Sequence, residues 1–169
     1  MTDTQTTTPL LAAAPPEMQE FAFLIGIWDV HLTSYRSDGG IGLEYDGVWR
    51  AEYKNAGRVL FDEFTRLSPD KEEVSYSATL RTFCPETDQW EMVFLFSQQR
   101  QNVQEFNGRF ENGEGIFKVR AEISPDRTAL GKVIFTNVEK NSFEWKLESS
   151  LDDGETWHLG RTMRARRVL

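Results

Sequence analysis

The 169-residue sequence contains very little cysteine, and this limits the chemistry available to it. A single thiol, that of Cys84, can form neither an internal disulfide nor a cysteine-based zinc site, so the chain is compatible with a reducing compartment. Cys84 stands before Pro85, where an apolar strand runs into a turn. Because a free cysteine usually behaves as a small hydrophobic residue, we predict a structural role for Cys84.

Long apolar runs are also missing. No stretch approaches the ~20 apolar residues of a membrane-spanning helix. The first residues have no basic region, and their apolar run is too short for a signal peptide. We therefore expect a cytoplasmic protein without membrane contact, in which residues 1–14 form a disordered tail and residues 15–169 form one folded domain.

Positive charge is scarce as well. Acidic residues outnumber basic ones by 27 to 19, which gives a formal net charge of −8. A negative surface repels phosphate backbones, so we do not expect the protein to bind nucleic acid. Four arginines stand close together at the end of the chain, but strand alternation would send them to both faces, and we predict no basic patch from them: Arg161, Arg164, Arg166 and Arg167.

Motifs for catalysis and cofactor binding are absent. The sequence has no dinucleotide-binding glycine motif, no phosphate-binding loop, no nucleophile elbow and no paired histidines. Its two histidines, His31 and His158, are too isolated to form a histidine-rich zinc site, and we expect His31 on the surface. We therefore predict neither a metal nor a cofactor.

Aromatic residues, in contrast, are plentiful. Twelve Phe, five Trp and four Tyr make up 12% of the chain. A domain of this size buries about 70% of the surface that its unfolded chain exposes. Such a number of large flat side chains can fill a core, and it can equally line a cavity for a small molecule.

The order of apolar and polar residues predicts an all-β fold. Residues 17–24 are expected to form a short helix between Pro16 and Gly26, and beyond Gly26 the apolar period changes to two. Strands with one apolar and one polar face, joined by short turns, are typical of a single antiparallel up-and-down barrel of about ten strands, because closure hides the strand edges. The predicted strands cover residues 27–35, 44–54, 58–67, 74–84, 89–98, 103–110, 115–123, 131–139, 142–150 and 156–167.

One strand departs from this alternation. Beyond Glu91, the segment 90–96 is apolar on both faces. A strand of this kind needs cover on both sides. We expect it to lie beneath the short helix, with a homodimer contact as the alternative.

Two local patterns are more specific. In the first, the predicted helix runs through Gly26 into a strand whose second residue is Trp28. The second pattern, Ser150–Trp157, matches the Ser-x-Asp-x-Gly-x-Thr-Trp of an Asp box, which forms a hairpin turn. Sialidase-like propellers repeat an Asp box once per blade. Here it occurs once in a short chain, so glycosidase function is not predicted.

With these patterns the chain resembles the lipocalin-like family of unknown function called DUF1579. The resemblance implies a calycin-type barrel in which Trp28 packs under an arginine of the last strand, Arg164 or Arg166, through a cation–π contact worth up to about 2 kcal/mol. It implies no catalytic residue, and the chain departs from the family at Cys84. The shared segments are Phe23–Val30, Thr79–Phe83, Pro85–Trp90 and Glu148–Trp157.

The expected function is binding of a small apolar or aromatic molecule in the barrel. One or two inward polar groups would orient that molecule, and Glu63 and Arg81 are the candidates. An inward Glu63 would need a partner such as Arg81 or a raised pKa suited to acid–base chemistry, whereas a free inward Arg81 would bind an anion. The predicted ligand-binding residues are Trp49, Tyr53, Phe94, Phe96, Phe117, Phe135 and Trp145.

Three alternatives remain open at this stage. The same cavity could fold a natural-product intermediate for cyclisation or isomerisation, a reaction that needs little acid–base equipment, so the sequence does not decide whether the protein is an enzyme. It could hold haem through His158, as nitrobindin-like barrels of similar architecture do with a histidine of a late strand. Finally, the barrel could serve only as a dimerisation module.

Overall fold

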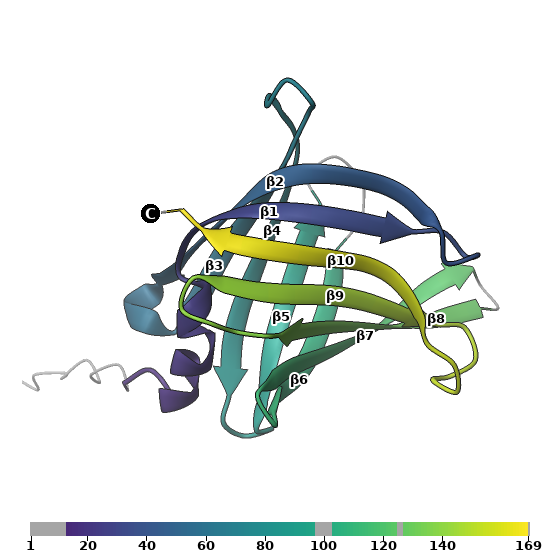
Figure 1. Cartoon of the computed structure of the whole chain (residues 1–169). Coiled ribbons are helices and arrows are strands. Elements are labelled where there is room, and N and C mark those ends of the chain that lie inside the picture. The colour runs from purple at the N-terminus through teal and green to yellow at the C-terminus, as the bar shows by residue number, and fades with distance from the viewer. Residues whose placement is uncertain (1–12, 97–102, 125–126, 169) are drawn as a thin grey trace, which may run out of the picture.

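The computed structural model describes residues 13–96, 103–124 and 127–168. Within them, ten antiparallel strands close into a barrel in which sequence neighbours pair and β1 pairs with β10 (Figure 1). This confirms the all-β, up-and-down prediction. The predicted tail, residues 1–14, lies outside the described residues except for its last two. The strands are β1 (Gly26–Tyr35), β2 (Ile41–Lys54), β3 (Val59–Leu67), β4 (Glu73–Cys84), β5 (Gln89–Phe96), β6 (Val103–Glu111), β7 (Glu114–Ser124), β8 (Arg127–Thr136), β9 (Ser142–Ser150) and β10 (His158–Arg167).

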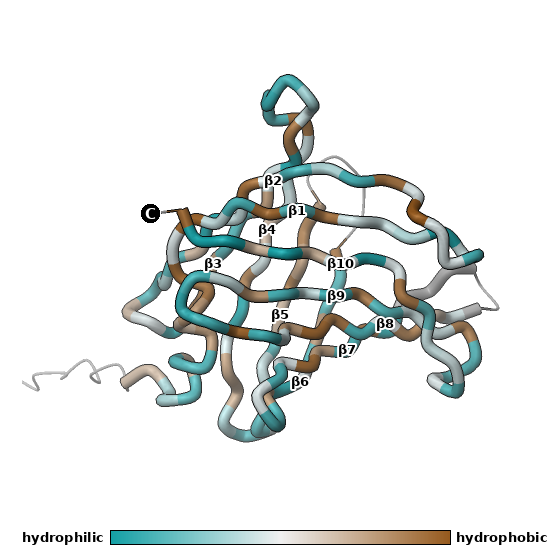
Figure 2. Tube along the Cα trace, viewed as in Figure 1, coloured by the Kyte–Doolittle hydropathy of each residue, from teal (hydrophilic) through white to brown (hydrophobic). Residues whose placement is uncertain are grey.

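Alternation and turn chemistry build this wall. Along β1, Trp28 and Val30 are buried while Asp29 and His31 are exposed, and Figure 2 shows hydrophobic and hydrophilic residues alternating along the strands. The turn between β6 and β7 uses Asn112 and Gly113 with φ of 53° and 84°. A two-residue turn with positive φ at both positions matches the twist of the two strands that it joins.

The Asp-box segment forms the connection between β9 and β10, as predicted. The Asp152 carboxylate accepts hydrogen bonds from the Ser150 hydroxyl at 2.6 Å and from the Thr156 backbone N–H at 2.9 Å. Together with the Thr156 hydroxyl, these donors hold the pKa of Asp152 well below its usual range. The Trp157 indole N–H donates to the Gly154 carbonyl at 3.1 Å, so this residue folds back over the turn.

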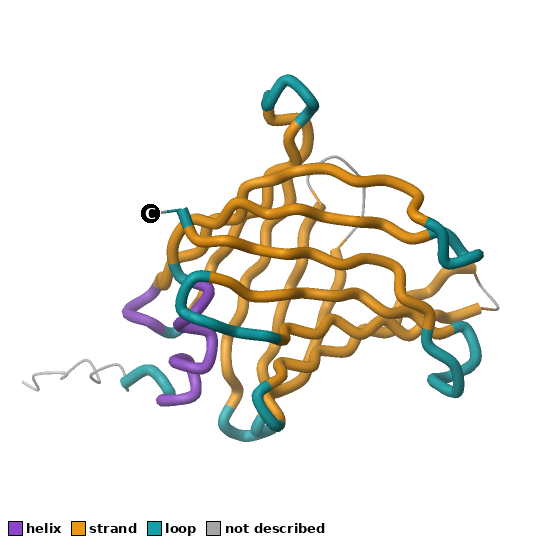
Figure 3. Tube along the Cα trace, viewed as in Figure 1, coloured by secondary structure: helices purple, strands orange, loops and turns teal. Residues whose placement is uncertain are grey.

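A short 3-10 helix, η1 (Pro16–Leu24), closes one end of the barrel. Its three buried side chains, Met18, Phe21 and Leu24, are spaced three residues apart, which suits the three-residue turn of a 3-10 helix better than the α-helix. Figure 3 shows η1 and the smaller η2 (Asn55–Gly57) at this same end. Neither is long or apolar enough to cross a bilayer, and these are the helices of the described residues.

The side chain of Phe21 is the centre of the core. It is fully buried, and its ring lies 4.8 Å from the Trp90 ring, 4.9 Å from Phe110 and 5.4 Å from both Phe117 and Phe135. Edge-to-face and offset packing at these distances is the favoured geometry for aromatic rings. The helix therefore plugs its end of the barrel with a solid aromatic cluster.

The arginine that packs on Trp28 is Arg167. Its guanidinium carbon lies 4.1 Å from the Trp28 ring centroid, and the two residues are direct partners in the β1–β10 ladder. The predicted Arg164 and Arg166 are exposed on the outer face, so that assignment was wrong. Because successive side chains alternate, a register different by one residue exchanges the two faces.

The β5 strand, predicted to lie beneath the helix, does so at its start. Trp90 is fully buried against Phe21, and its indole N–H donates to the Glu20 carboxylate at 2.8 Å. Further along, Leu95 remains 41% exposed on the outer face. The homodimer contact stays a prediction.

Candidate functional site

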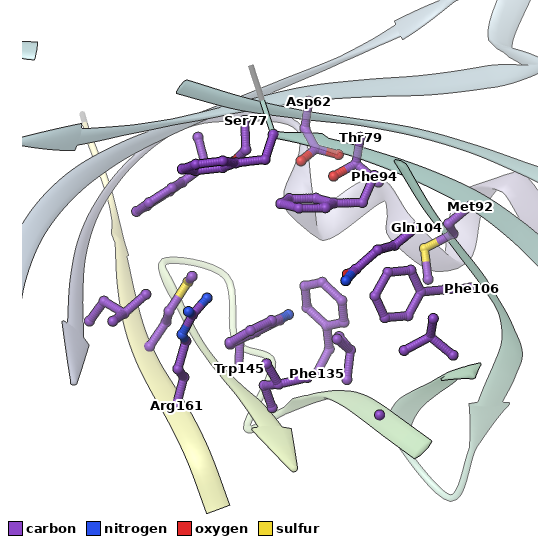
Figure 4. A pocket seen from close by; sticks show the side chains of 18 of the residues that line it. Asp62, Ser77, Thr79, Met92, Phe94, Gln104, Phe106, Phe135, Trp145 and Arg161 are labelled. Atoms are coloured by element: carbon purple, nitrogen blue, oxygen red, sulfur yellow. The ribbon is translucent and has the colours of Figure 1, made fainter. Parts of the chain in front are cut away.

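A cavity of about 290 Å³ occupies the inside of the barrel beyond the aromatic cluster. Trp49 and Phe135, which belong to that cluster, form its floor. It extends from there toward the end opposite η1, where β2 and β10 begin, which we call the mouth end. Figure 4 shows Phe94, Phe106 and Trp145 around this space.

The structure brings together most of the predicted ligand-binding residues. Lining the cavity are Trp49, Phe94, Phe96, Phe135 and Trp145. Their contact with a ligand remains a prediction.

The other two predicted residues lie at the plugged end. Phe117 is fully buried against Phe21, and the Tyr53 hydroxyl donates to the carbonyl of Met18 in η1. Neither lines the cavity, so their placement there was wrong. Both side chains do point inward, but η1 fills the part of the barrel that they reach.

A buried ion pair stands on the cavity wall. The Arg81 guanidinium contacts the Asp62 carboxylate, and both side chains are at most 5% exposed. Asp62 also accepts the indole N–H of Trp49 at 2.8 Å, and Arg81 Nε lies 3.1 Å from the Met92 sulfur. Burial lowers the pKa of Arg81 to about 9, which still leaves it charged at neutral pH. Arg81 thus points inward, but its charge is already matched by a carboxylate.

The predicted inward carboxylate was assigned to the wrong residue. Glu63 is exposed on the outer face of β3, and its neighbour Asp62 faces the cavity in its place. Leu60 and Phe64 lie on the same inner face as Asp62, whereas Phe61 lies on the outer face with Glu63. The apolar residues of β3 are therefore divided between both faces. Nothing in the sequence indicated which of the two adjacent carboxylates, Asp62 or Glu63, would be buried.

The histidines lie outside the cavity. His158 is exposed at the start of β10 and does not line the cavity. His31 is exposed as predicted, with its ring nitrogen 2.9 Å from the Asp46 carboxylate. His158 pairs with Ser149, which does line the cavity, and haem binding through His158 stays a prediction. Among the described side chains no three of His, Cys, Asp or Glu gather as a metal site.

Two arginines and a tyrosine at the mouth end were missed from the sequence. Arg161 lines the cavity where it meets solvent, and so does Tyr45 (Figure 4 labels Arg161). The guanidinium carbon of Arg66 lies 4.5 Å above the Tyr45 ring. Burial raises the pKa of the Tyr45 hydroxyl, and the charges of Arg161 and Arg66 oppose that rise. The position of Arg66 on the inner face follows from the same β3 alternation that places Asp62 inside.

Comparison with known proteins identifies the fold. No protein-family model and no curated protein sequence matches the chain. The solved structure of Rv2717c from M. tuberculosis is 9% identical, with 92% of this chain and 99% of that chain covered and a TM-score of 0.59. The S-type phycobiliprotein lyase CPES from Guillardia theta is 11% identical, with 92% and 98% covered and a TM-score of 0.56. At such identities the likeness is one of fold alone: the chain shares a closed antiparallel barrel with these proteins.

Proposed function

We propose that this protein binds a small apolar or aromatic molecule inside its barrel. The observation that carries the proposal is the unfilled, aromatic-lined cavity of about 290 Å³ beyond a solidly packed plug. Protein interiors are close-packed and contain few voids larger than a water molecule. Ligand pockets begin at about 300 Å³ and combine apolar walls with a few fixed polar groups. Thr79 and Gln104 supply such groups here.

The narrower family assignment belongs to this proposal. The resemblance to the lipocalin-like DUF1579 family, with its calycin-type barrel, is supported by the contact of Trp28 with a last-strand arginine, although that arginine is Arg167. Cyclisation or isomerisation in the same cavity stays a prediction. The carboxylate that the cavity offers, Asp62, is held by Arg81 and Trp49, so no observation favours that alternative.

Filling the cavity is expected to abolish binding of an apolar probe. Ser77 lines the cavity on β4, and Ser77→Phe places a ring in the space. We expect the affinity for N-phenyl-1-naphthylamine, a neutral dye that fluoresces in apolar surroundings, to fall by at least roughly tenfold, which corresponds to about 1.4 kcal/mol. Fluorescence titration of the purified protein measures this change.

The matched control is Leu80→Phe on the same strand. Leu80 is 44% exposed on the outer face, so the added ring stays outside the barrel and dye affinity should remain within about twofold. If wild-type protein does not bind the dye, or if both variants lose it equally, the cavity is not a binding site.

A further inference from the structure

The mouth end of the cavity carries positive charge that the described residues do not neutralise. Of the described residues, three charged ones line the cavity: Asp62, Arg81 and Arg161. The first two neutralise each other deep in the wall, which leaves Arg161. Arg66 lies against the ring of Tyr45, which also lines the cavity, and its buried Nε has no hydrogen-bond partner among the described residues. Within the described ranges neither Arg66 nor Arg161 forms an ion pair, although the chain has 27 acidic residues.

The strand pairing places Tyr45, Arg161 and Arg66 at the mouth end of the barrel. Leu32 of β1 pairs with Tyr45 of β2 on one side and with Met163 of β10 on the other, and Arg161 stands two residues before Met163 on the same face. Arg66 comes from β3, the next strand along, opposite Gly47. Arg66 therefore lies on the strand next to that of Tyr45, and Arg161 lies on β10, on the far side of β1.

A buried N–H without an acceptor is unfavourable, and guanidinium groups satisfy such donors best with planar anions, which they bind through two parallel hydrogen bonds. Burial keeps the Tyr45 hydroxyl protonated, so it too is available as a donor. Arg66, Arg161 and Tyr45 are thus three donors without an anionic acceptor among the described side chains. The same cavity also offers the aromatic surfaces of Phe135 and Trp145.

We propose that the ligand is an amphipathic organic anion, with its apolar body on Phe135 and Trp145 and its anionic group at the mouth end on Arg161 and Arg66. This inference rests on the proposed function, because it assigns the charge of the molecule that the cavity takes. The Asp62–Arg81 pair plays no part in anion recognition, since its own charges are matched.

A pair of dyes with the same rings tests the proposal. 1-Anilinonaphthalene-8-sulfonate carries a sulfonate that N-phenyl-1-naphthylamine lacks. Wild-type protein should bind the sulfonate dye more tightly, and raising the salt concentration should weaken that dye alone. Arg161→Gln and Arg66→Gln are each expected to weaken the sulfonate dye roughly tenfold and to change the neutral dye less than about twofold, because only the former presents an anion to the guanidinium.

Two controls make the outcome specific. Arg164→Gln removes the same charge from the outer face of β10, where the side chain is 82% exposed, and should leave both affinities unchanged. Ser77→Phe should abolish binding of both dyes, which shows that they occupy the cavity. Equal affinity for the two dyes, or no effect of Arg161→Gln and Arg66→Gln, overturns the anion proposal and leaves the binding function standing. Failure of the neutral dye to bind overturns both.

Discussion

Replacing Asp62 by asparagine is expected to lower the free energy of unfolding by about 3–5 kcal/mol. The change removes the charge that matches Arg81, whose side chain is only 5% exposed. An isolated buried guanidinium loses its hydration and gains nothing in return. The asparagine oxygen can still accept the indole N–H of Trp49. The loss of stability therefore reports the missing charge and not a missing hydrogen bond.

Urea denaturation of wild type, Asp62→Asn and the double variant Asp62→Asn/Arg81→Gln measures this coupling. The double variant pairs an amide with an amide and should recover at least half of the lost stability, because no buried charge is left unmatched. The control is Glu63→Gln, which removes an exposed carboxylate one residue away and should change stability by less than about 0.5 kcal/mol. A double variant less stable than the single one would show that the pair is not the source of the loss.

Replacing Arg167 by glutamine is the second large effect that we expect, a loss of about 2–4 kcal/mol. The guanidinium donates to the carbonyls of Phe23 at 2.8 Å, Ile25 at 2.6 Å and Lys140 at 3.1 Å. The first two are carbonyls at the end of η1 that have no partner within the helix. The same group covers the Trp28 ring, so one side chain joins the plug, the first strand and the last.

Arg166→Gln is the matched control for this prediction. It removes the same charge from the adjacent, exposed position, and we expect its melting temperature to stay close to that of wild type. Thermal unfolding followed by circular dichroism compares the two variants. Equal destabilisation, or a larger effect of Arg166→Gln, would contradict the role of Arg167 in closing the barrel.

Local sequence signals were sufficient for the elements of this fold. Alternating residues and turn chemistry gave strand bounds within a few residues, as for β9, predicted and observed at residues 142–150. They also gave the helix at η1, because a proline precedes it and Gly26 follows it. These features depend on neighbours along the chain, and a single sequence contains that information.

The faces of mixed strands were not predictable in the same way. In β3, apolar residues occupy both parities, with Phe61 on the outer face and Leu60 on the inner one. Alternation therefore could not choose between Asp62 and Glu63. The position of an inward side chain along the barrel could not be predicted either. Phe117 and Phe135 both point inward, but only Phe135 reaches the cavity, because η1 fills the end of the barrel where Phe117 lies.

Contacts between distant strands were the hardest to foresee. The partner of Trp28 depends on the register of β1 against β10, and a shift of one residue exchanges Arg166 for Arg167. Predicting that Arg161 and Arg66 both lie at the mouth end requires two such registers, that of β1 with β10 and that of β2 with β3. Nothing near either arginine in the sequence marks it as part of a site.

The pairing of β1 with β10 has a consequence for how the chain is made. These two strands are far apart in the sequence, so during synthesis β1 keeps one unpaired edge until β10 has left the ribosome. An open sheet edge invites pairing with other chains, and contacts between such distant segments form slowly. Arg167, at the very end of β10, can engage η1 only after that edge is covered. The free edge of β1 thus stays open to pairing with other chains until β10 has been synthesised.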